Sequence, residues 1–284
     1  MDKNFYEEVD RIVDQALKED IGDGDHTSLS TIPADARGRA RLIAKESGML
    51  AGVYVAERVF KKIDSNIKFL ILRQDGEELT EGDAIFDVEG PSASLLTAER
   101  LALNFLQRMS GIATATNQLS KMIEGSNCKI LDTRKTTPNL RILEKYSVKT
   151  GGGENHRFGL YDMILIKDNH IDFAGGIKKA IDACRNYLEK NEKKLPIEIE
   201  VRNFKELEEV MKAGGVDRIM LDNFTPDDLE QAVKLINGKY ETEASGGITK
   251  NTIRDYAKTG VDFVSVGSLT HQIRSLDLSM IAVV

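Results

Sequence analysis

The sequence predicts an α/β protein in which a mixed helix-and-sheet domain precedes an α/β barrel. After residue 111, short apolar runs alternate with helical stretches, as they do in a parallel sheet with crossover helices. Polar or glycine-rich residues follow these runs at once, which favours a barrel, because functional groups gather where barrel strands end. The first 110 residues lack this alternation. An open doubly wound sheet remains the alternative architecture for the second half.

The chain is expected to open with an amphipathic helix. Apolar residues recur at helical spacing from Val9 to Leu17. The helix ends at residues 21–27, a turn cluster that contains acidic side chains and His26. This cluster lacks the closing Glu of a calcium-binding hand, so we interpret it, including His26, as a structural turn.

Strands and two further helices fill the rest of the first domain. Polar and apolar residues alternate over 38–44, which predicts a half-buried strand. A long helix begins at Pro91, and its apolar residues between Leu95 and Met109 form a buried face. The remaining elements are a helix at 52–63 and strands at 67–72 and 84–88, with Asp-Gly and Glu-Gly turns between these strands.

The predicted barrel contains six strands. They cover residues 129–132, 163–166, 197–201, 218–222, 240–245 and 262–266. Helical stretches between them cover residues 174–191, 204–213, 226–236 and 250–259. The apolar residues 275–284 are expected to pack back on the first domain, which gives domains at 1–110 and 111–274.

Composition and charge narrow the possible functions. The net charge of −7 argues against bulk nucleic-acid binding. No apolar run approaches the length of a membrane span, and the charged N-terminal segment does not resemble a signal or transit peptide. The two cysteines have no metal-binding or disulfide spacing, as expected for a cytoplasmic protein with reduced thiols.

A local excess of cations in residues 132–170 contrasts with this acidic background. Cations gathered in an acidic protein usually face an anion. There are more of them than one phosphate needs, and arginine pairs bidentately with carboxylates. We therefore expect a phosphorylated ligand and a carboxylated ligand to bind together. The cations concerned are Arg134, Lys135, Arg157 and Lys167, with His156 as a further donor to a carboxylate.

Two predicted strand ends carry glycine-containing turns that precede helices. These turns are Ser245-Gly246-Gly247 and Gly267-Ser268. Glycine lets backbone N–H groups approach a phosphate closely, and a helix N-terminus adds partial positive charge. A phosphate site after the last two strands is a recurrent barrel feature, while plain tight turns are the structural alternative. Residues 151–153, three glycines in a row, are less specific.

Carboxylates are expected inside the barrel as well. Glu198 and Glu200 lie on one face of a predicted parallel strand, where they must meet a cation, a metal or water. With Asp222 at a neighbouring strand end, Glu200 could bind sugar hydroxyls or a magnesium ion. A structural pair between Glu200 and a nearby Lys or Arg is the alternative. His170 and His271 could be either ligands or structural histidines.

Several segments closely resemble the quinolinate phosphoribosyltransferase family, and the resemblance covers essentially the whole chain. The segments are EDIGDGDHTS, LTAERLALNFLQRMSGIAT, DTRKTTPNLR, KTGGGENHRFGLYDMILIKDNHI, EASGGI and VGSLTH. The resemblance implies an N-terminal α/β sandwich domain, an incomplete α/β barrel, and dimers or hexamers built from dimers. It implies a magnesium-dependent pentosyltransferase of NAD biosynthesis. That reaction joins quinolinate to phosphoribosyl pyrophosphate and gives nicotinate mononucleotide, pyrophosphate and carbon dioxide.

The resemblance also implies individual roles. Arg134, Arg157 and Lys167 would bind the quinolinate carboxylates, with His156 nearby. Lys135, Glu200 and Asp222 are the catalytic candidates, and the two carboxylates would contact the ribose and magnesium directly or through substrate and water. Arg100 would come from the partner subunit, which the strand-end argument does not reveal. The other expected substrate contacts are Thr133, Ser245, Gly246, Gly247, Val266, Gly267, Ser268 and His271.

One departure and two rival functions remain at this point. Asn139 stands where the family commonly has glycine, in a predicted loop. The first rival is a related phosphoribosyltransferase that acts on another aromatic acid, such as a paralogue associated with molybdate-transport genes. A non-catalytic sensor of a phosphorylated metabolite would bind ligand without turnover, and the presence of Glu200 and Asp222 beside the cations argues against it.

Overall fold

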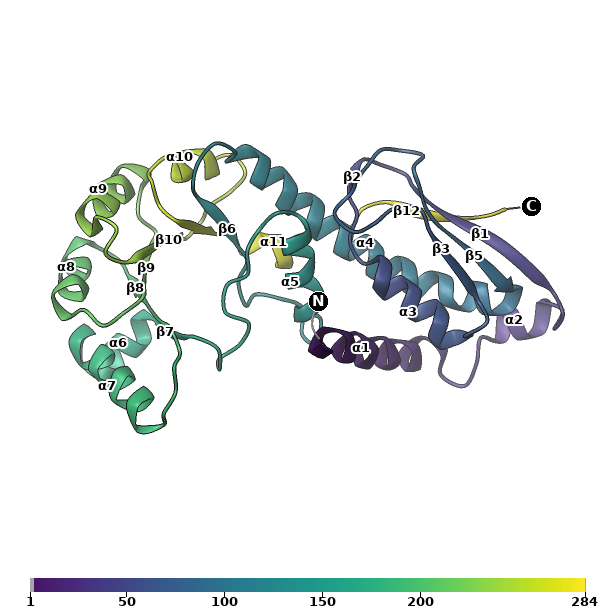
Figure 1. Cartoon of the computed structure of the whole chain (residues 1–284), viewed down its shortest axis with the longest axis horizontal. Helices are drawn as coiled ribbons and strands as arrows, with labels where there is room; N and C mark the ends of the chain where they lie inside the picture. Colours follow the sequence, from purple (N-terminus) through teal and green to yellow (C-terminus); the bar gives the residue numbers. More distant parts are fainter. Residues whose placement is uncertain (1–2, 284) are drawn as a thin grey trace. The chain divides into compact units, whose positions relative to one another are not determined.

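The computed structural model describes residues 3–283, which form two compact units (Figure 1). The first unit contains the described residues up to Asn117, the segment Thr136–Gly152 and the residues from Ser268 onward. The second contains Gln118–Lys135 and Gly153–Gly267. Helix α4 (Ser92–Met122) runs from the first unit into the second, so the boundary predicted at residue 110 lies within a helix.

The first unit is built on a four-stranded antiparallel sheet with the order β12-β1-β5-β3. Its last strand in the sequence pairs with its first, with Ala40 opposite Ala282. The C-terminal segment therefore lies on the first unit; Val284 is outside the described residues. The strands are β1 (Arg37–Ala44), β3 (Lys68–Ile71), β5 (Ala84–Pro91) and β12 (Leu278–Ala282), and a small second sheet pairs β2 (Gly48–Met49) with β4 (Glu78–Leu79).

Helices complete the first unit, and two of them, α2 (His26–Thr31) and α5 (Arg141–Thr150), were not predicted. Helix α2 begins inside the predicted turn cluster, because the Asp25 carboxylate accepts the Ser28 N–H at 3.1 Å and caps the helix. Sequence periodicity does not reveal so short a helix. The other helices of this unit are α1 (Lys3–Ile21), α3 (Val53–Ile63), α4 and α11 (Ser268–His271).

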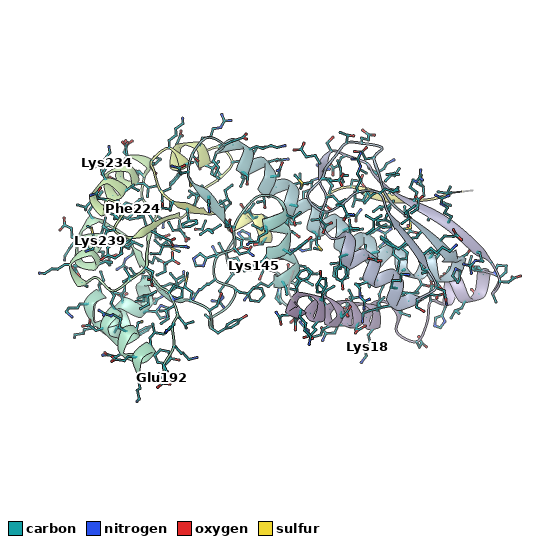
Figure 2. All side chains as sticks on the ribbon, viewed as in Figure 1. Lys18, Lys145, Glu192, Phe224, Lys234 and Lys239 are labelled. Carbon is teal, nitrogen blue, oxygen red and sulfur yellow. The ribbon has the colours of Figure 1, made fainter. Side chains whose placement is uncertain are left out.

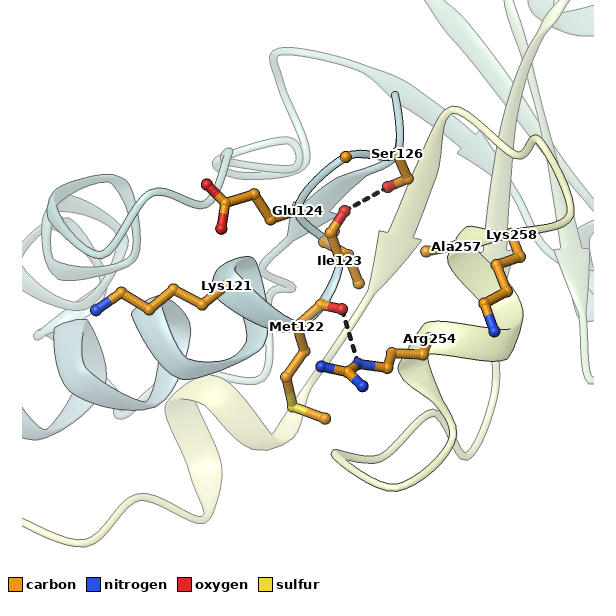
Figure 3. Close-up of a pocket in the computed structure, with 9 residues that line it drawn as sticks. Lys121, Met122, Ile123, Glu124, Ser126, Arg254, Ala257 and Lys258 are labelled. Carbon is orange, nitrogen blue, oxygen red and sulfur yellow. Dashed lines mark hydrogen bonds between the residues drawn. The ribbon is translucent and has the colours of Figure 1, made fainter.

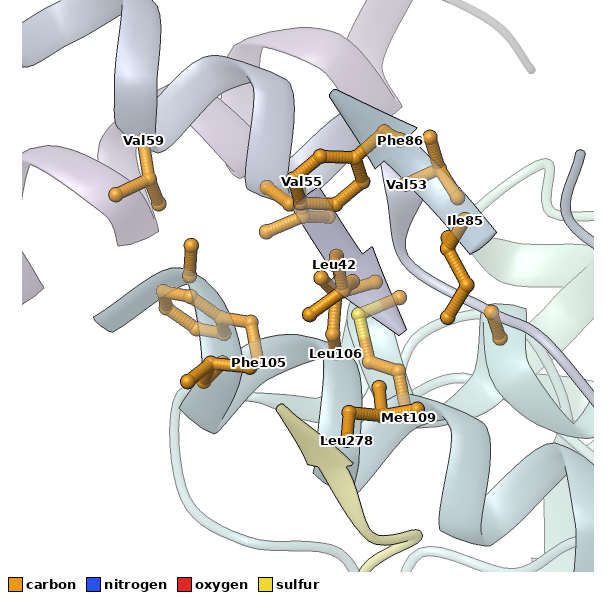
Figure 4. Close-up of a cluster of buried hydrophobic side chains, with 14 of the residues drawn as sticks. Leu42, Val53, Val55, Val59, Ile85, Phe86, Phe105, Leu106, Met109 and Leu278 are labelled. Carbon is orange, nitrogen blue, oxygen red and sulfur yellow. The ribbon is translucent and has the colours of Figure 1, made fainter. Parts of the chain in front are cut away.

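The core of the first unit lies between its sheet and helices α3 and α4 (Figure 4). Leu42 of β1, Phe86 of β5 and Leu106 of α4 are completely buried there. Each fully buried side chain of this size contributes about 1.5–3 kcal/mol. In this core, β1 and β5 pack against α4. Helix α4 also contains Arg100 and Arg108.

The second unit is a six-stranded parallel sheet with the order β6-β11-β10-β9-β8-β7. Strands that follow one another in the sequence are neighbours from β7 to β11, and the first strand lies beside the last. This circular order is that of a barrel, whereas a doubly wound sheet reverses its strand order at a switch point. No hydrogen-bonded ladder joins β6 to β7 among the described residues, so the predicted incomplete barrel is confirmed. The strands are β6 (Lys129–Leu131), β7 (Ile164–Ile166), β8 (Ile197–Val201), β9 (Arg218–Asp222), β10 (Glu241–Ser245) and β11 (Phe263–Ser265).

Helices cover the outer side of this curved sheet (Figure 1). The predicted helix at 174–191 is wrong at its start, because Gly175 and Gly176 have positive φ and end one helix before the next begins. The observed helix α10 (Ile253–Ala257) is shorter than the helix predicted at 250–259. The other helices are α6 (Asp168–Ala174), α7 (Ile177–Lys190), α8 (Phe204–Ala213) and α9 (Pro226–Ile236).

Charged side chains lie mainly on the outside of both units. Glu192, Lys234 and Lys239 are exposed in the second unit (Figure 2), whereas Lys145 in α5 of the first unit is only 1% exposed. Within residues 3–283, no helix combines the length and apolar character that crossing a membrane requires.

Candidate active site

A pocket of about 350 Å³ lies among strand ends of the second unit. This volume lies in the range of small-ligand sites. Its residues come from β7, β9, β10 and β11 and from the segments after β6, before β7 and after β7. They are Thr133, Arg134, Lys135, His156, Arg157, Leu165, Lys167, Met220, Glu243, Ser245 and Ser265. The structure thus gathers the predicted cations around one cavity, together with Ser245 at the start of a glycine turn.

Arg157 is a partly buried cation of this pocket. Its Nη1 donates to the Met163 carbonyl oxygen at 3.2 Å. Burial, and then repulsion from Arg134, lower the pKa of Arg157. A guanidinium stays charged in proteins, so the two arginines form a cationic wall that an anion would stabilise.

Lys167 and Glu200 form an ion pair at the rim, with 3.3 Å between Nζ and Oε2. Glu200 is only 9% exposed. A buried carboxylate requires a nearby cation, and Lys167 provides it. The structural alternative for Glu200 is thus present in the structure, but the cation that pairs with it also lines the pocket. Asp222 lies at the end of β9 and accepts a hydrogen bond from Asn223 Nδ2 at 2.6 Å.

A buried cluster of His156, Glu198 and Glu243 lies behind the cationic wall. His156 Nδ1 accepts the Arg157 N–H at 2.6 Å, while Nε2 lies 3.0 Å from Glu198 Oε2 and 3.4 Å from Glu243 Oε2. Arg218 Nη1 lies 3.3 Å from Glu243 Oε2. The three residues are of types that could hold a metal ion, although Arg218 already supplies positive charge. His156 therefore faces carboxylates of the protein as well as the pocket.

The two carboxyls of this cluster hold protons unusually tightly. Burial, and then repulsion from Glu198, raise the pKa of Glu243 to about 8, against smaller opposing effects of His156, Ser265 and Arg218. Burial also raises the pKa of Glu198. The sequence interpretation missed Glu243, although a Glu inside a parallel strand is itself a signal that could have found it.

Replacing Glu243 with Gln should change how stability depends on pH. The folded protein binds a proton at Glu243 up to about pH 8, whereas the unfolded chain releases it near the ordinary pKa of 4.5. Wild-type stability should therefore fall as pH rises from about 5 to 8.5, by an amount on the order of a few kcal/mol. Melting temperatures of Glu243→Gln should decline less over this interval. The exposed variant Glu208→Gln is the control, and parallel curves for all three proteins would contradict the assignment.

The turn after β10 has the open backbone that a phosphate site requires. Gly246 and Gly247 have φ of +100° and +62°, and the Asn223 N–H donates to the Ser245 carbonyl oxygen at 2.8 Å. The helix predicted from residue 250 begins three residues later, because α10 starts only at Ile253. The backbone of the glycines, rather than a helix dipole, is therefore what this turn offers an anion.

The remaining predicted residues are spread over both units. Arg100 is exposed on α4, and Ser268 and His271 belong to α11, all in the first unit. His170 Nδ1 accepts the Lys167 N–H at 2.9 Å, which gives it a structural role at the start of α6. His26 lies 3.4 Å from Asp23 in the exposed turn. Thr133, Val266 and Gly267 follow or end β6 and β11 in the second unit.

A larger pocket of the second unit contains no predicted site residue (Figure 3). It is lined by residues 121–126 and by α10, and Arg254 Nε donates to the Met122 carbonyl oxygen at 3.1 Å. The guanidinium thus satisfies a carbonyl at the end of α4. This is a structural contact, so the smaller cationic pocket is the candidate site.

Comparison with known proteins gives concordant matches. The family models for the quinolinate phosphoribosyl transferase N-terminal and C-terminal domains match residues 25–110 and 112–281. The chain is 43% identical to quinolinate phosphoribosyltransferase [decarboxylating] 1b of Nicotiana tabacum, over 95% of this chain and 81% of that protein. It is 42% identical to the probable nicotinate-nucleotide pyrophosphorylase [carboxylating] of Bacillus subtilis, over 96% and 93%. The crystal structure of NadC from Streptococcus pyogenes superposes with a TM-score of 0.92 at 43% identity, covering 96% of this chain and 95% of that one.

Proposed function

The chain belongs to the quinolinate phosphoribosyltransferase family, and we propose that it transfers the phosphoribosyl group of phosphoribosyl pyrophosphate to quinolinate with loss of carbon dioxide. The products are nicotinate mononucleotide and pyrophosphate, which places the enzyme in the synthesis of NAD. The observation that carries the proposal is the single pocket in which Arg134, Arg157 and Lys167 approach Ser245 of the glycine turn. Such a pocket suits a dianionic pyridine beside a sugar phosphate.

Quinolinate binds against the cationic wall. Its two carboxylates take the charges of Arg134, Arg157 and Lys167, and arginine forks fix the plane of the ring. The apolar side chains of Leu165 and Met220, which also line the pocket, suit the faces of that ring. This arrangement brings the ring nitrogen towards the ribose in a defined orientation, which is the larger part of catalysis here.

The 5′-phosphate binds at the turns after β10 and β11. Backbone N–H groups of Gly246, Gly247 and Gly267 approach it without side chains in the way. Ser245, Ser268 and His271 are the polar side chains in these segments, and Val266 precedes Gly267. This end of the site fixes the sugar while the pyridine end fixes the acceptor.

The transfer itself needs no side-chain nucleophile. The ring nitrogen forms a bond to C1′ of the ribose while the bond from C1′ to the pyrophosphate oxygen breaks. Positive charge develops on the ribose ring, and the carboxylates of Glu200 and Asp222 stabilise it. Quinolinate competes with Glu200 for Lys167, which frees Glu200 for the ribose. Lys135 lies between the two ligands and neutralises the leaving pyrophosphate.

Decarboxylation follows from the new pyridinium. The bond between C2 and its carboxylate breaks, and the electron pair left on C2 is stabilised by the adjacent positive nitrogen. A proton from water then binds to C2. The protein contributes by releasing its hold on one carboxylate while Arg134 and Arg157 retain the other.

Magnesium, partners and location belong to the proposal as well. Glu200 and Asp222 offer the carboxylate oxygens that Mg²⁺ prefers, so both residues fit such an ion, directly or through substrate and water. An ion held there would help to neutralise charge on the departing pyrophosphate, beside Lys135. The enzyme acts as a homodimer or a trimer of dimers in which Arg100 reaches the site of the partner subunit. Two free thiols, Cys128 and Cys184, support a cytoplasmic location.

One assay tests this function against its rivals. Purified protein is incubated with quinolinate, phosphoribosyl pyrophosphate and Mg²⁺, and nicotinate mononucleotide and carbon dioxide are measured. We expect both products in equal amounts and no turnover of nicotinate. Turnover of another aromatic acid instead would identify a related transferase, and ligand binding without turnover would identify a sensor.

A further inference from the structure

Arg108 of α4 stands at the centre of a hydrogen-bond network in the first unit. Its Nε and Nη2 lie 2.9 Å and 2.5 Å from Oε1 of Glu144 in α5. Nη2 also lies 2.6 Å from Thr137 Oγ1 and 3.2 Å from the Thr270 carbonyl oxygen. The Glu144 side chain is 1% exposed and the Arg108 side chain 31% exposed, so the carboxylate is shielded from water while the guanidinium is partly accessible. One guanidinium therefore joins four segments of the chain.

Two of these segments lead directly from predicted ligand-binding loops. Thr137 follows Lys135 by two residues, and its N–H donates to Glu144 Oε2 at 3.1 Å. Both partners of the ion pair thus fix the end of the loop that begins after β6. Thr270 follows Ser268 by two residues in α11, so the same guanidinium fixes the end of the segment that begins after β11.

An ordinary structural pair elsewhere in this unit provides a contrast. Arg58 binds Asp10 bidentately, with distances of 2.7 Å and 3.0 Å, and joins α3 to α1. No loop of the candidate site takes part in that pair. Arg108 instead donates hydrogen bonds to a hydroxyl and a carbonyl from two separate loops, in addition to the Glu144 carboxylate. A lysine could not reproduce this, since it lacks the planar fork.

We propose that Arg108 and Glu144 are positioning residues that hold the loop after β6 and the segment after β11 at a fixed mutual spacing for phosphoribosyl transfer. The inference rests on the proposed function, because these loops bind the pyridine and the phosphate there. Neither residue lines the pocket. They contact Thr137 and Thr270, each of which lies two residues after an expected ligand-binding residue. A shift of about 1 Å in ligand-binding groups can cost about 100-fold in rate.

Arg108→Lys tests the proposal, with Arg58→Lys as the matched control. We expect Arg108→Lys to lower kcat/KM by about 30-fold and to raise the KM of both quinolinate and phosphoribosyl pyrophosphate. Thr137→Val removes only the hydroxyl on the first loop and should raise mainly the KM of quinolinate. Arg58→Lys should lower the melting temperature by a similar amount to Arg108→Lys but leave both KM values within about twofold.

Two results would contradict a positioning role for Arg108 and Glu144. If Arg108→Lys keeps both KM values within twofold of wild type, or if Arg58→Lys changes them equally, the network is merely structural. If Arg108→Lys does not fold, the double variant Arg108→Met/Glu144→Leu avoids a buried unpaired charge and serves instead, with the same KM criterion. Failure of the proposed function would show differently, as a wild-type protein that does not use quinolinate.

Discussion

Arg157→Ala is expected to lower kcat/KM for quinolinate by about 1,000-fold, which corresponds to about 4 kcal/mol of lost transition-state stabilisation. The side chain is partly buried beside Arg134, so a carboxylate bound there is largely removed from water. Charge-assisted hydrogen bonds in such a setting contribute about 1.5–3 kcal/mol each, and a guanidinium can make two to one carboxylate. Steady-state kinetics with each substrate varied in turn should show the loss mainly with quinolinate.

The fold should survive this substitution. Burial and the neighbouring Arg134 both disfavour the Arg157 charge in the absence of ligand, as its lowered pKa indicates. Among the described residues, the Arg157 guanidinium donates one hydrogen bond, to the Met163 carbonyl oxygen, so removing the side chain costs little. Circular dichroism should give a melting temperature within a few degrees of wild type.

Two further variants separate charge from geometry at this position. Arg157→Lys keeps the charge but loses the fork, and it should recover about tenfold of the lost activity. Arg185→Ala removes an exposed arginine of α7 in the same unit and should leave activity unchanged. Near-normal quinolinate turnover by Arg157→Ala would show that the carboxylates bind elsewhere.

Strand positions and the gathering of cations could be predicted from the sequence because each depends on local pattern. A buried parallel strand is an apolar run, and residues that follow such runs meet at one end of a barrel. Arg134, Lys167 and Ser245 satisfy this rule, and all three line one pocket. The circular strand order then follows from helices that return the chain to the same side of the sheet.

The parts that could not be predicted depend on contacts between distant segments. The sequence near His156 does not indicate that Glu243 Oε2 lies 3.4 Å from His156 Nε2. His156 belongs to the segment before β7, whereas Glu243 belongs to β10. The role of His170 was undecided for a local reason, because its bond to the Lys167 N–H depends on the geometry of the first turn of α6. Helix limits failed where glycine conformation decides them, as at Gly175.

Gly246→Ala is expected to raise the KM for phosphoribosyl pyrophosphate by about 100-fold and to lower the melting temperature. Its φ of +100° lies where residues with a side chain are strained by about 1–3 kcal/mol. An added Cβ would also meet Asn223 Oδ1 at 2.2 Å, the Asn223 side-chain carbon at 2.7 Å and the Asn223 backbone nitrogen at 3.0 Å. The turn must therefore move away from β9, taking with it the N–H groups offered to the phosphate.

Two other glycines separate this displacement from backbone strain alone. Gly238, beyond α9, has φ of +70° and no atom within 4 Å of an added Cβ, so Gly238→Ala should lower the melting temperature without changing either KM. Gly247 has φ of +62° and equally open surroundings, but it lies in the turn itself. Gly247→Ala should therefore raise the KM for phosphoribosyl pyrophosphate less than Gly246→Ala does. If Gly238→Ala and Gly246→Ala had the same effect on that KM, the loss would come from general destabilisation, and the turn after β10 would not be the phosphate site.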